Sequence, residues 1–421
     1  MINKTLLVSA LCAGLLTMPV WANQTKLAVS LDNHAPADLA TLISNALPGH
    51  PRLLAARNAL QAAATRLRAA ERPLYNPELA FDTENTDINT TVLQYSQKID
   101  SGGQRKARTG VAEAGLKAAR ARFELARLSL LHDLLTALSD QQSGKEIAAL
   151  AVEGLALMRE FANIARRRYR AGDLSQVETN LAQLAYNEAL MAHAQALTTY
   201  TASQERVIAL FPTPPGKTGV LPESLPSPVL PADVEAFIIE LPTIRKSASN
   251  VDALSARVAL RKSERSWEPT LAVRGGREDE ESLVGLTLSL PLKIRNDQKA
   301  EVQTARQELA QAEQTLRQTV RDLKAQVLSS TQRYRLLRSA FNTWRESGRE
   351  YIDSQLALTK RLWRSGDMST TDYLVQLKQA LDTQASGIEL RKQMWRSSFE
   401  WMKDTASIDD WLEITNTGTD K

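Results

Sequence analysis

The spacing of apolar residues along the chain is typical of very long helices. After residue 104 they recur at alternating steps of four and three, at Ala112, Leu116, Ala119, Phe123, Ala126 and Leu130. This is the spacing of a coiled-coil seam, and we expect the interspersed charged residues, Arg127 among them, to point away from it. The register returns at Ala305, Leu309, Ala312 and Leu316. We predict long helices over residues 104–168 and 298–362, the first of them roughly 97 Å long.

Four short segments alternate apolar and polar residues with period two, which predicts β-strands. They cover residues 77–85, 91–98, 269–277 and 283–291 and form two hairpins. Strands of about this length cross a bilayer when they are tilted, so we expect one apolar set to face lipid: Leu79, Phe81, Leu93, Tyr95, Leu271, Val273, Val284, Leu286 and Leu288. Tyr75 and Trp267 precede the hairpins, where aromatic residues of a membrane interface lie. A small soluble sheet capping a helical bundle is the alternative.

The second half of the chain repeats the first. The stretch RYRAGDLSQVE, Arg168–Glu178, returns as LWRSGDMSTTD, Leu362–Asp372, with Arg, Gly, Asp and Ser shared at an offset of 194 residues. PADLA pairs with PADVE, and YNPELAF with WEPTLAV, at nearly the same offset. We predict a first repeat at 23–210 and a second at 232–407. A proline-rich linker at 211–231 joins them, and a C-terminal tail follows at 408–421.

Each of the two repeated stretches predicts a tight turn between helices, at residues 169–174 and 363–368. Gly172 and Gly366 supply the positive φ angles that a helix reversal needs. The helices that follow can be capped by a serine with an acidic residue three positions later, Ser175 with Glu178 and Ser369 with Asp372. Four residues have no role in this local scheme, and we expect them to form exposed aromatic–cation pairs for contact with another protein: Tyr169, Arg170, Trp363 and Arg364.

The N-terminus has the pattern of an export signal. Lys4 precedes an apolar stretch, and small Ala22 marks the expected cleavage point, so we predict a signal peptide at 1–22. Cys12, the only cysteine, lies inside this peptide behind Leu11, which disfavours a lipoprotein. The mature chain would then lack cysteine, which excludes disulfides and thiol catalysis. No later stretch has the roughly eighteen consecutive apolar residues of a membrane-spanning helix.

The charge pattern argues against a nucleic-acid-binding protein, and the lack of catalytic motifs argues against an enzyme. The 421 residues are 43% hydrophobic and 5% aromatic, and the 52 basic and 48 acidic residues are interspersed along the chain, as on solvated helix faces. The glycine-rich stretch SGGQRKARTG lacks the lysine pattern of a phosphate loop, and no hydrolase, protease or dinucleotide motif is present. The histidines are scattered, so we expect no metal site and no cofactor: His34, His50, His132 and His193.

The order of these elements, the segment SQKIDSGGQRKAR after the second strand and the twin YRAGDLS and WRSGDMS turns together resemble the TolC-like outer-membrane efflux factors. The QKIDSGGQRKAR segment is most similar to the CzcC-type branch, the partners of heavy-metal pumps. The resemblance covers about residues 37–407. It implies a mainly α fold with a small β part, a duplicated helix–hairpin–long helix–turn–helix. Four strands cannot close a barrel, and the family's members are trimers: a twelve-strand outer-membrane β-barrel continues into a twelve-helix periplasmic α-barrel.

By this resemblance the chain is a passive exit duct in the Gram-negative outer membrane, extending into the periplasm. Its expected partners are a periplasmic adaptor protein, an inner-membrane RND-type pump, outer-membrane lipid and two further copies of itself, and its expected cargo is heavy-metal cations. The turns form the periplasmic tip, and the adaptor-contact residues implied there are Tyr169, Arg170, Gly172, Leu174, Ser175, Trp363, Arg364, Gly366, Met368 and Ser369.

A periplasmic gate is the second implied site, with Asp372 and Glu178 as candidates. Asp372 matches the first of two aspartates that constrict the tunnel entrance in relatives, but Val375 stands at the second position, so a double aspartate ring is not expected. Capping of the following helix explains Asp372 equally well. Drug efflux and type I protein secretion remain alternative roles for a duct of this kind. A soluble periplasmic coiled-coil adaptor is the alternative from a different class.

Overall fold

The first half of the chain passes through two helices, a hairpin, a very long helix and a returning helix. The computed structural model describes residues 29–211 and 221–414. The predicted signal peptide, with Cys12 and Ala22, lies outside the described residues, as do residues 212–220 of the predicted linker. The elements of the first half are α1 (Ala37–Ala46), α2 (Pro51–Ala70), β1 (Glu78–Asn85), β2 (Asn89–Lys98), α3 (Gln104–Arg170) and α4 (Gln176–Leu210).

The second half follows the same order. Its elements are α5 (Val234–Ile239), α6 (Pro242–Ser263), β3 (Thr270–Glu278), β4 (Glu281–Ser289), α7 (Lys299–Ser365), α8 (Thr370–Asp404) and a short additional α9 (Ile408–Trp411). The long helices α3 and α7 each contain 67 residues, and the returning helices α4 and α8 each contain 35. Equal lengths in the two halves are what a duplicated chain with loop-confined insertions produces.

The four strands form one antiparallel sheet in the order β1-β2-β3-β4. Each hairpin pairs internally, and β2 pairs with β3, with Tyr95 opposite Val273. The two predicted hairpins are therefore joined edge to edge. The predicted fold class, mainly helical with a small β part, is confirmed.

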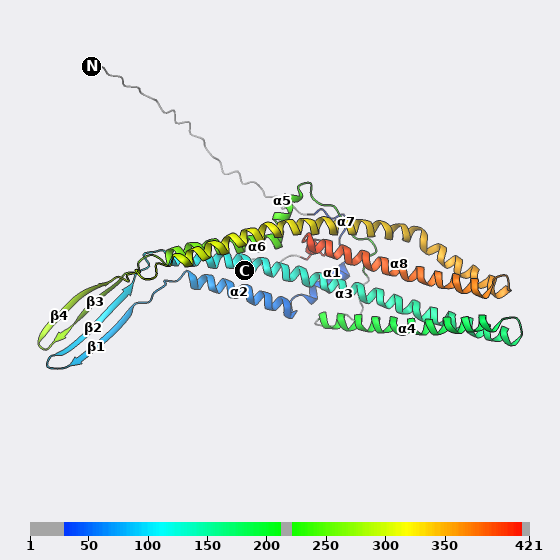
Figure 1. The fold of residues 1–421 in the computed structure, drawn as a ribbon, viewed down its shortest axis with the longest axis horizontal. Helices are drawn as coiled ribbons and strands as arrows, with labels where there is room; N and C mark the ends of the chain where they lie inside the picture. The colour runs from blue at the N-terminus through cyan, green and yellow to red at the C-terminus, as the bar shows by residue number, and fades with distance from the viewer. Residues whose placement is uncertain (1–28, 212–220, 415–421) are drawn as a thin grey trace, which may run out of the picture.

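The molecule is a long rod with different ends. Figure 1 shows the sheet at one end and both helix reversals at the other, with α3 and α7 running between them. A helix of 67 residues rises by about 100 Å at ~1.5 Å per residue. The sheet and the reversals are thus separated by most of the molecule's length, and any function at one end is remote from the other.

The residues of the predicted helix seam are buried or half-buried, with one correction to the charged residues around them. Ala119, Phe123 and Leu130 are buried in α3. Arg127, which we expected to point outward, is also buried, and its guanidinium lies 2.9 Å from Asp409 Oδ1 near α9. A straight helix drifts relative to a strict seven-residue repeat, so the buried stripe turns around α3 and brings Arg127 inward.

Aromatic residues of α7, α8 and α9 occupy the main core, at the middle of the rod. Trp395, Trp401, Trp411 and Tyr334 are fully buried there, where α8 packs against α7 and α9. Burial raises the pKa of the Tyr334 phenol to about 12. Ile408 and Trp411 lie in the stretch that we predicted to be a C-terminal tail, so as far as residue 414 that expectation is wrong: its apolar side chains are core residues.

The described part of the proline-rich segment also packs on this core instead of linking two separate bodies. Leu221 and Leu225 are buried. The carbonyl of Pro222 accepts a hydrogen bond from Trp395 Nε1 at 2.9 Å, and that of Pro226 accepts one from the Tyr334 hydroxyl at 2.6 Å. Proline holds the backbone extended, so these carbonyls are positioned to satisfy buried donors of α7 and α8.

Candidate functional site

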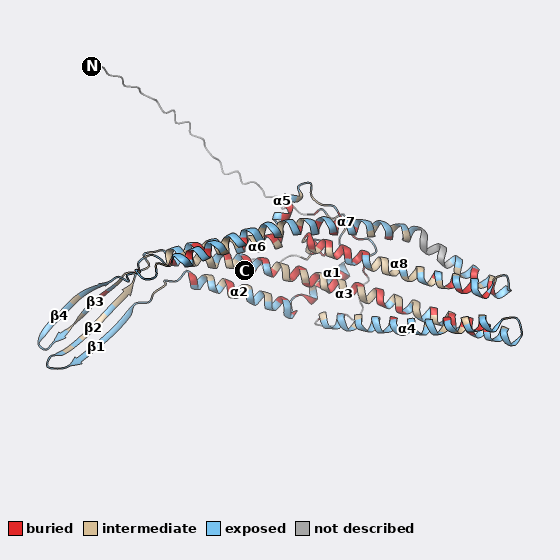
Figure 2. Ribbon diagram, viewed as in Figure 1, coloured by how far each residue is buried: buried red, intermediate tan, exposed pale blue. Residues whose placement is uncertain are grey.

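The sheet has one apolar face. Leu79 pairs with Tyr95, Tyr95 with Val273, and Val273 with Leu286, so the predicted lipid-facing residues of all four strands lie on the same side. All nine are exposed, from 39% for Leu271 to 85% for Val284, and Figure 2 shows the strands as largely exposed. A contiguous apolar face of this kind on a monomer indicates an interaction surface. Contact with lipid itself stays a prediction.

The opposite face of the sheet carries mostly small and polar residues, with Val92 and Leu283 as apolar exceptions. Arg274 lies there and pairs with Gly285 across β3 and β4, and a Cβ at Gly285 would come within 2.6 Å of Arg274 Nε. The glycine therefore makes room for the long side chain. β1 and β4 are the edge strands of the four-stranded order, so among the described residues each has one side without a partner strand.

A buried carboxylate links the sheet to the helices. Glu268, 8% exposed, accepts a hydrogen bond from the Tyr75 hydroxyl at 2.6 Å and forms an ion pair with Lys98 at 2.5 Å. Gln104, the first residue of α3, also donates to it. Burial tends to raise the pKa of Glu268, but the bonds from Lys98 and Tyr75 outweigh it and hold the pKa below its usual value. The cluster joins the segments entering and leaving the sheet.

The two predicted interface aromatics differ in their surroundings. Trp267 is 56% exposed beside the junction. Tyr75 is half-buried, with its hydroxyl bound to Glu268 and the Lys98 ammonium 4.3 Å from its ring centroid. Tyr75 therefore has a structural role in the junction, whereas the side chain of Trp267 remains available to the surroundings.

Both helix reversals adopt the predicted backbone. Gly172 has φ 85° and Gly366 has φ 88°, in the left-handed region that favours glycine. Ser175 and Glu178 form a reciprocal capping box at the start of α4. At the start of α8, Ser369 accepts a hydrogen bond from the Asp372 backbone at 3.0 Å and donates to its carboxylate at 2.7 Å. Asp372, exposed in this chain, thus takes part in a cap.

The expected exposure of Trp363 is wrong. Its side chain is 2% exposed, stacked on Tyr373 with ring centroids 4.3 Å apart and packed against Phe161 at 5.2 Å. The reason is a contact between the two helical hairpins, α3 with α4 and α7 with α8: Phe161 comes from α3, while Trp363 and Tyr373 come from α7 and α8. Two other expected docking residues, Leu174 and Met368, are half-buried against the same cluster.

Arg364 is exposed but held in place. Its guanidinium forms an ion pair with Glu160 of α3 at 2.6 Å, and Lys360 binds the other oxygen at 3.1 Å. Hydrogen bonds from Arg364 and Lys360 lower the pKa of Glu160. Arg168 also crosses between hairpins, donating to the Trp363 carbonyl at 3.3 Å. Sequence reasoning missed Glu160 and Arg168 because their partners lie some 200 residues away. The sequence shows that these residues are charged, but not which residues they contact.

The remaining docking residues are accessible. Tyr169 is 43% exposed, and Arg170 is exposed next to it at the end of α3. Val375, at the position where relatives have a second aspartate, is 58% exposed. The tip therefore presents one aromatic–cation pair instead of the expected two.

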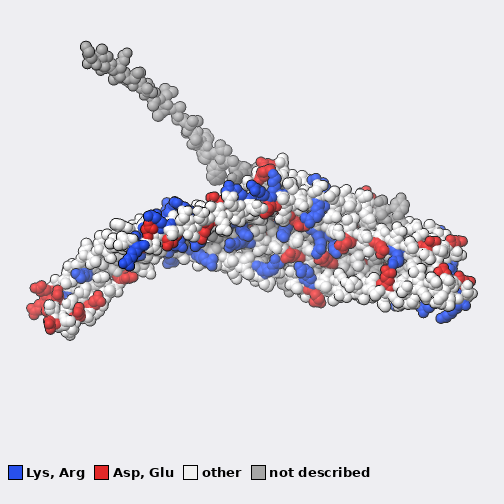
Figure 3. Space-filling model, in the orientation of Figure 1, with Lys and Arg blue, Asp and Glu red and all other residues white. Residues whose placement is uncertain are grey.

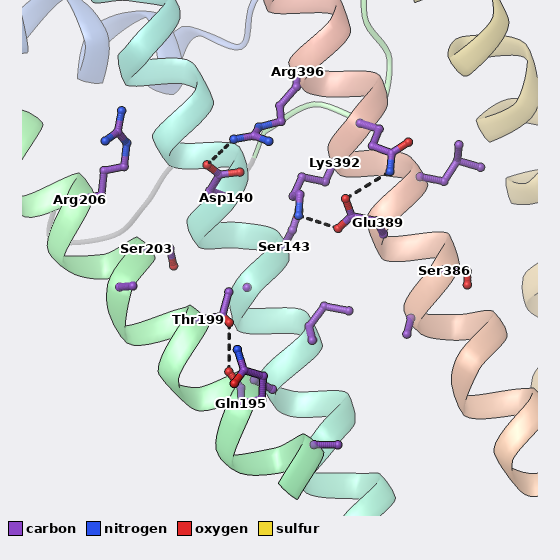
Figure 4. Close-up of a pocket in the computed structure, with 18 residues that line it drawn as sticks. Asp140, Ser143, Gln195, Thr199, Ser203, Arg206, Ser386, Glu389, Lys392 and Arg396 are labelled. Atoms are coloured by element: carbon purple, nitrogen blue, oxygen red, sulfur yellow. Dashed lines mark hydrogen bonds and ion pairs between the residues drawn. The ribbon is translucent and has the colours of Figure 1, made fainter. Parts of the chain in front are cut away.

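A groove of about 1010 Å³ lies between α3, α4 and α8. Figure 4 shows two ion pairs among its lining residues: Arg396 of α8 with Asp140 of α3 at 3.1 Å, across the groove, and Lys392 with Glu389 at 2.6 Å, along α8. Serine hydroxyls line the groove, but neither histidine nor cysteine does. Within residues 29–211 and 221–414, no group of three or more potential metal ligands occurs.

The helices described here are amphipathic or polar. None of them, in the part of the chain that the structure covers, is long and apolar enough to cross a membrane.

Two curated proteins are similar to parts of this chain. It is 27% identical over 223 residues to the nickel-cobalt-cadmium resistance protein NccC of Alcaligenes xylosoxydans xylosoxydans. It is 25% identical over 253 residues to the cobalt-zinc-cadmium resistance protein CzcC of Cupriavidus metallidurans. These matches cover 52% and 56% of this chain, and they span only 51% and 60% of the relatives' own lengths.

Solved structures share the fold over nearly the whole chain. The outer membrane channel CmeC of Campylobacter jejuni has a TM-score of 0.74 at 14% identity, covering 91% of this chain and 90% of its own. The channel MtrE of Neisseria gonorrhoeae has a TM-score of 0.72 at 17% identity, covering 91% and 94%. The family model described as outer membrane efflux protein matches residues 42–211 and 238–400. The chain belongs to the outer membrane efflux protein family.

Proposed function

We propose that three copies of this chain form a passive exit duct in the Gram-negative outer membrane, as part of a tripartite efflux system. The apolar face of the four-stranded sheet carries this proposal. Its nine apolar side chains are exposed, and such a face is unfavourable in water but suits the acyl region of a bilayer. As a member of its family, the chain is a channel component and not an enzyme.

The open sheet edges favour a closed assembly of several copies. Within the part of the chain that the structure describes, β1 and β4 each lack a partner strand on one side. Unpaired strand edges in lipid leave backbone groups without hydrogen bonds. Three copies would supply twelve strands. On α4, Val177, Leu184 and Met191 are 76%, 65% and 67% exposed at seven-residue spacing, which fits side-by-side contact with a helix of another copy.

Substitutions on the two faces of β4 test the membrane assignment. Leu286 and Thr287 are adjacent and exposed but lie on opposite faces. Leu286→Arg should reduce insertion sharply, because arginine on a lipid face costs about 2–4 kcal/mol near the bilayer midplane. Thr287→Arg is the matched control and should insert. Heat-modifiability in the outer-membrane fraction reports insertion, and equal insertion of both variants would reject a lipid-facing role for this side.

The opposite end of the rod would dock a periplasmic adaptor, which in turn joins an inner-membrane RND-type pump. Tyr169 and Arg170 are the exposed aromatic–cation pair there. Replacing both with alanine should weaken site-specific cross-linking to the adaptor without altering insertion. Arg66→Ala, an exposed cation on α2, is the matched control. Undiminished cross-linking in the double variant would remove these residues from the docking site.

The proposed gate is the ring of exposed Asp372 side chains that three copies would bring together, with Glu178 beside it. Asp372 is also part of the α8 cap, so Asp372→Ser, which removes the charge, separates gating from capping when combined with a helix-stability measurement. Higher single-channel conductance with unchanged helix stability supports gating. Unchanged conductance leaves Asp372 with the cap alone.

Heavy-metal cations are the proposed cargo. The names of NccC and CzcC, resistance to nickel, cobalt, zinc or cadmium, support this assignment. A deletion strain should lose resistance to one or more of these cations and regain it with the wild-type chain. Restored resistance to drugs or restored protein secretion alone would favour the alternative cargoes, and a freely soluble periplasmic product would favour the adaptor alternative. Cleavage near Ala22 also remains a prediction, tested by N-terminal sequencing.

A further inference from the structure

The apolar face of the sheet continues beyond its last strand. β4 ends at Ser289, yet Leu290, Leu292 and Ile294 keep the alternation and are 42%, 67% and 84% exposed. In the first repeat, Ile99 follows β2 and is 44% exposed; KID at residues 98–100 aligns with KIR at 293–295. Both repeats therefore expose an isoleucine where the sheet gives way to the long helix, and no part of the described chain covers it.

Basic residues gather at the same place. Residues 99–108 and 290–299 together contain six bases and two acids, and Figure 3 shows Lys and Arg side chains at the end of the sheet nearest the helices. Arg105 and Lys106 lie in the first turn of α3, which has no acidic residue. Positive charge is unfavourable at a helix N-terminus. Helix stability therefore does not explain these residues.

Three of the bases remain free to bind a partner. Arg108 donates to backbone carbonyls of Ala70 and Arg72, and Lys293 and Lys299 have partners inside the junction. In the described chain, the side chains of Arg105, Lys106 and Arg295 are exposed and have neither a hydrogen bond nor an ion pair. The nearby Asp100 carboxylate accepts a hydrogen bond from the Arg105 backbone at 2.8 Å and attracts its charge.

The far end of the sheet has the opposite charge. The two hairpin loops, residues 84–89 and 277–281, contain six acids and one base, and Figure 3 shows these acids at the extremity of the sheet. The apolar face therefore lies between an acidic end and a basic end. A layer of anionic headgroups is electrostatically complementary to the basic end alone.

We propose that this basic collar, composed of Ile99, Arg105, Lys106, Leu292, Ile294 and Arg295, binds anionic phospholipid headgroups of the periplasmic leaflet. The apolar members reach the acyl boundary, as in other interfacial segments, while the three cations contact phosphates. The inference rests on the proposed function, because it assumes that the sheet lies in the outer membrane. Each basic residue near an anionic surface contributes roughly fivefold in affinity, so the three together account for up to roughly a hundredfold.

Competition between two lipids tests the collar. The mature full-length protein, purified from outer membranes in detergent, is mixed with equal amounts of phosphatidylglycerol and phosphatidylcholine, and bound lipids are counted by native mass spectrometry. The wild type should retain phosphatidylglycerol in excess, and raising the salt concentration should reduce that excess. Arg105→Gln, Lys106→Gln and Arg295→Gln in one chain should bring the ratio close to one.

Two further variants keep the test decisive. Arg105→Lys with Arg295→Lys preserves the charge and should preserve the excess. Arg166→Gln, Arg167→Gln and Arg170→Gln remove three exposed cations at the other end of the rod and should leave it unchanged. An equal ratio in the wild type, or preferential retention of lipopolysaccharide, would overturn the collar while leaving the duct intact. Failure of the wild type to insert into phosphatidylcholine vesicles would instead contradict the proposed function.

Discussion

The two helix reversals have the same backbone and opposite surroundings. Tyr169 and Trp363 occupy equivalent positions 194 residues apart, each three residues before a glycine with φ near 85–88°. Tyr169 is 43% exposed, whereas Trp363 is 2% exposed. Their neighbours diverge in the same way: the Arg170 side chain forms neither a hydrogen bond nor an ion pair with the described residues, whereas Arg364 is held by Glu160.

The contact between the hairpins accounts for this divergence. Phe161 of α3 packs against Trp363, but the position equivalent to Phe161 in the second repeat is the polar Gln355. Only one of the two reversals can therefore bury its aromatic residue between the hairpins. Both repeats keep the same local geometry. Packing of the first repeat against the second buries Trp363 in the core of the tip and leaves Tyr169 exposed for binding.

Truncating the two aromatic residues should have the largest and most unequal effect. Trp363→Ala removes a fully buried side chain and should lower the free energy of opening the tip by about 3–5 kcal/mol. Tyr169→Ala, at the equivalent exposed position, should change it by about 0.5 kcal/mol or less. Hydrogen exchange of backbone amides in residues 158–182 and 354–380 measures both. Equal effects would mean that the reversals are not differently packed.

Substitution of Gly172 and of Gly366 should have similar effects, which tests the backbone geometry that the two reversals share. A Cβ at Gly172 or Gly366 meets no atom within 4 Å, so only the positive φ opposes substitution. Alanine at either position should cost about 1–2 kcal/mol. Gly49→Ala is the control, because Gly49 also has open space but no positive φ. Gly366→Val should in addition abolish export-dependent resistance in an inserted assembly, and retained resistance would separate the reversal from docking.

The ion pairs of Glu160 should have the smallest effect and a distinct pH dependence. Its side chain is 40% exposed, so Glu160→Gln should weaken the tip by about 0.2–1 kcal/mol. Because the folded pKa lies below the ordinary value of 4.5, this stabilisation is present above pH 4.5 and is lost as the pH falls through the folded pKa. Hydrogen exchange of the tip at pH 3–6 should show this loss in the wild type and not in the variant; parallel profiles would exclude Glu160 as its source.

Local periodicity predicted the features that one element determines alone. Alternation in β4 identified the side on which Leu286 lies, and the heptad spacing identified both long helices, with α3 ending at Arg170, two residues beyond the prediction. The glycine and serine positions of the reversals followed from backbone geometry and capping. Each of these features depends on residues a few positions apart.

Features that depend on distant contacts were not predictable in the same way. Nothing near Trp363 in the sequence indicates that Phe161 covers it. Arg127 is buried beside α9, which returns to α3 and supplies Asp409. The proline-rich residues 221–231 were predicted to be a linker because the residues that donate to their carbonyls, Trp395 and Tyr334, lie more than 100 residues away. Sequence patterns identify the face of an element that is apolar, but not the element that will cover it.

The central claim is that one chain supplies only part of a pore wall, so that further copies must complete it. Native mass spectrometry of the mature protein extracted from outer membranes, without boiling, measures this directly. We predict a single species with the mass of three chains that converts to one chain on heating. A stable single chain, recovered from the soluble periplasmic fraction, would contradict the account.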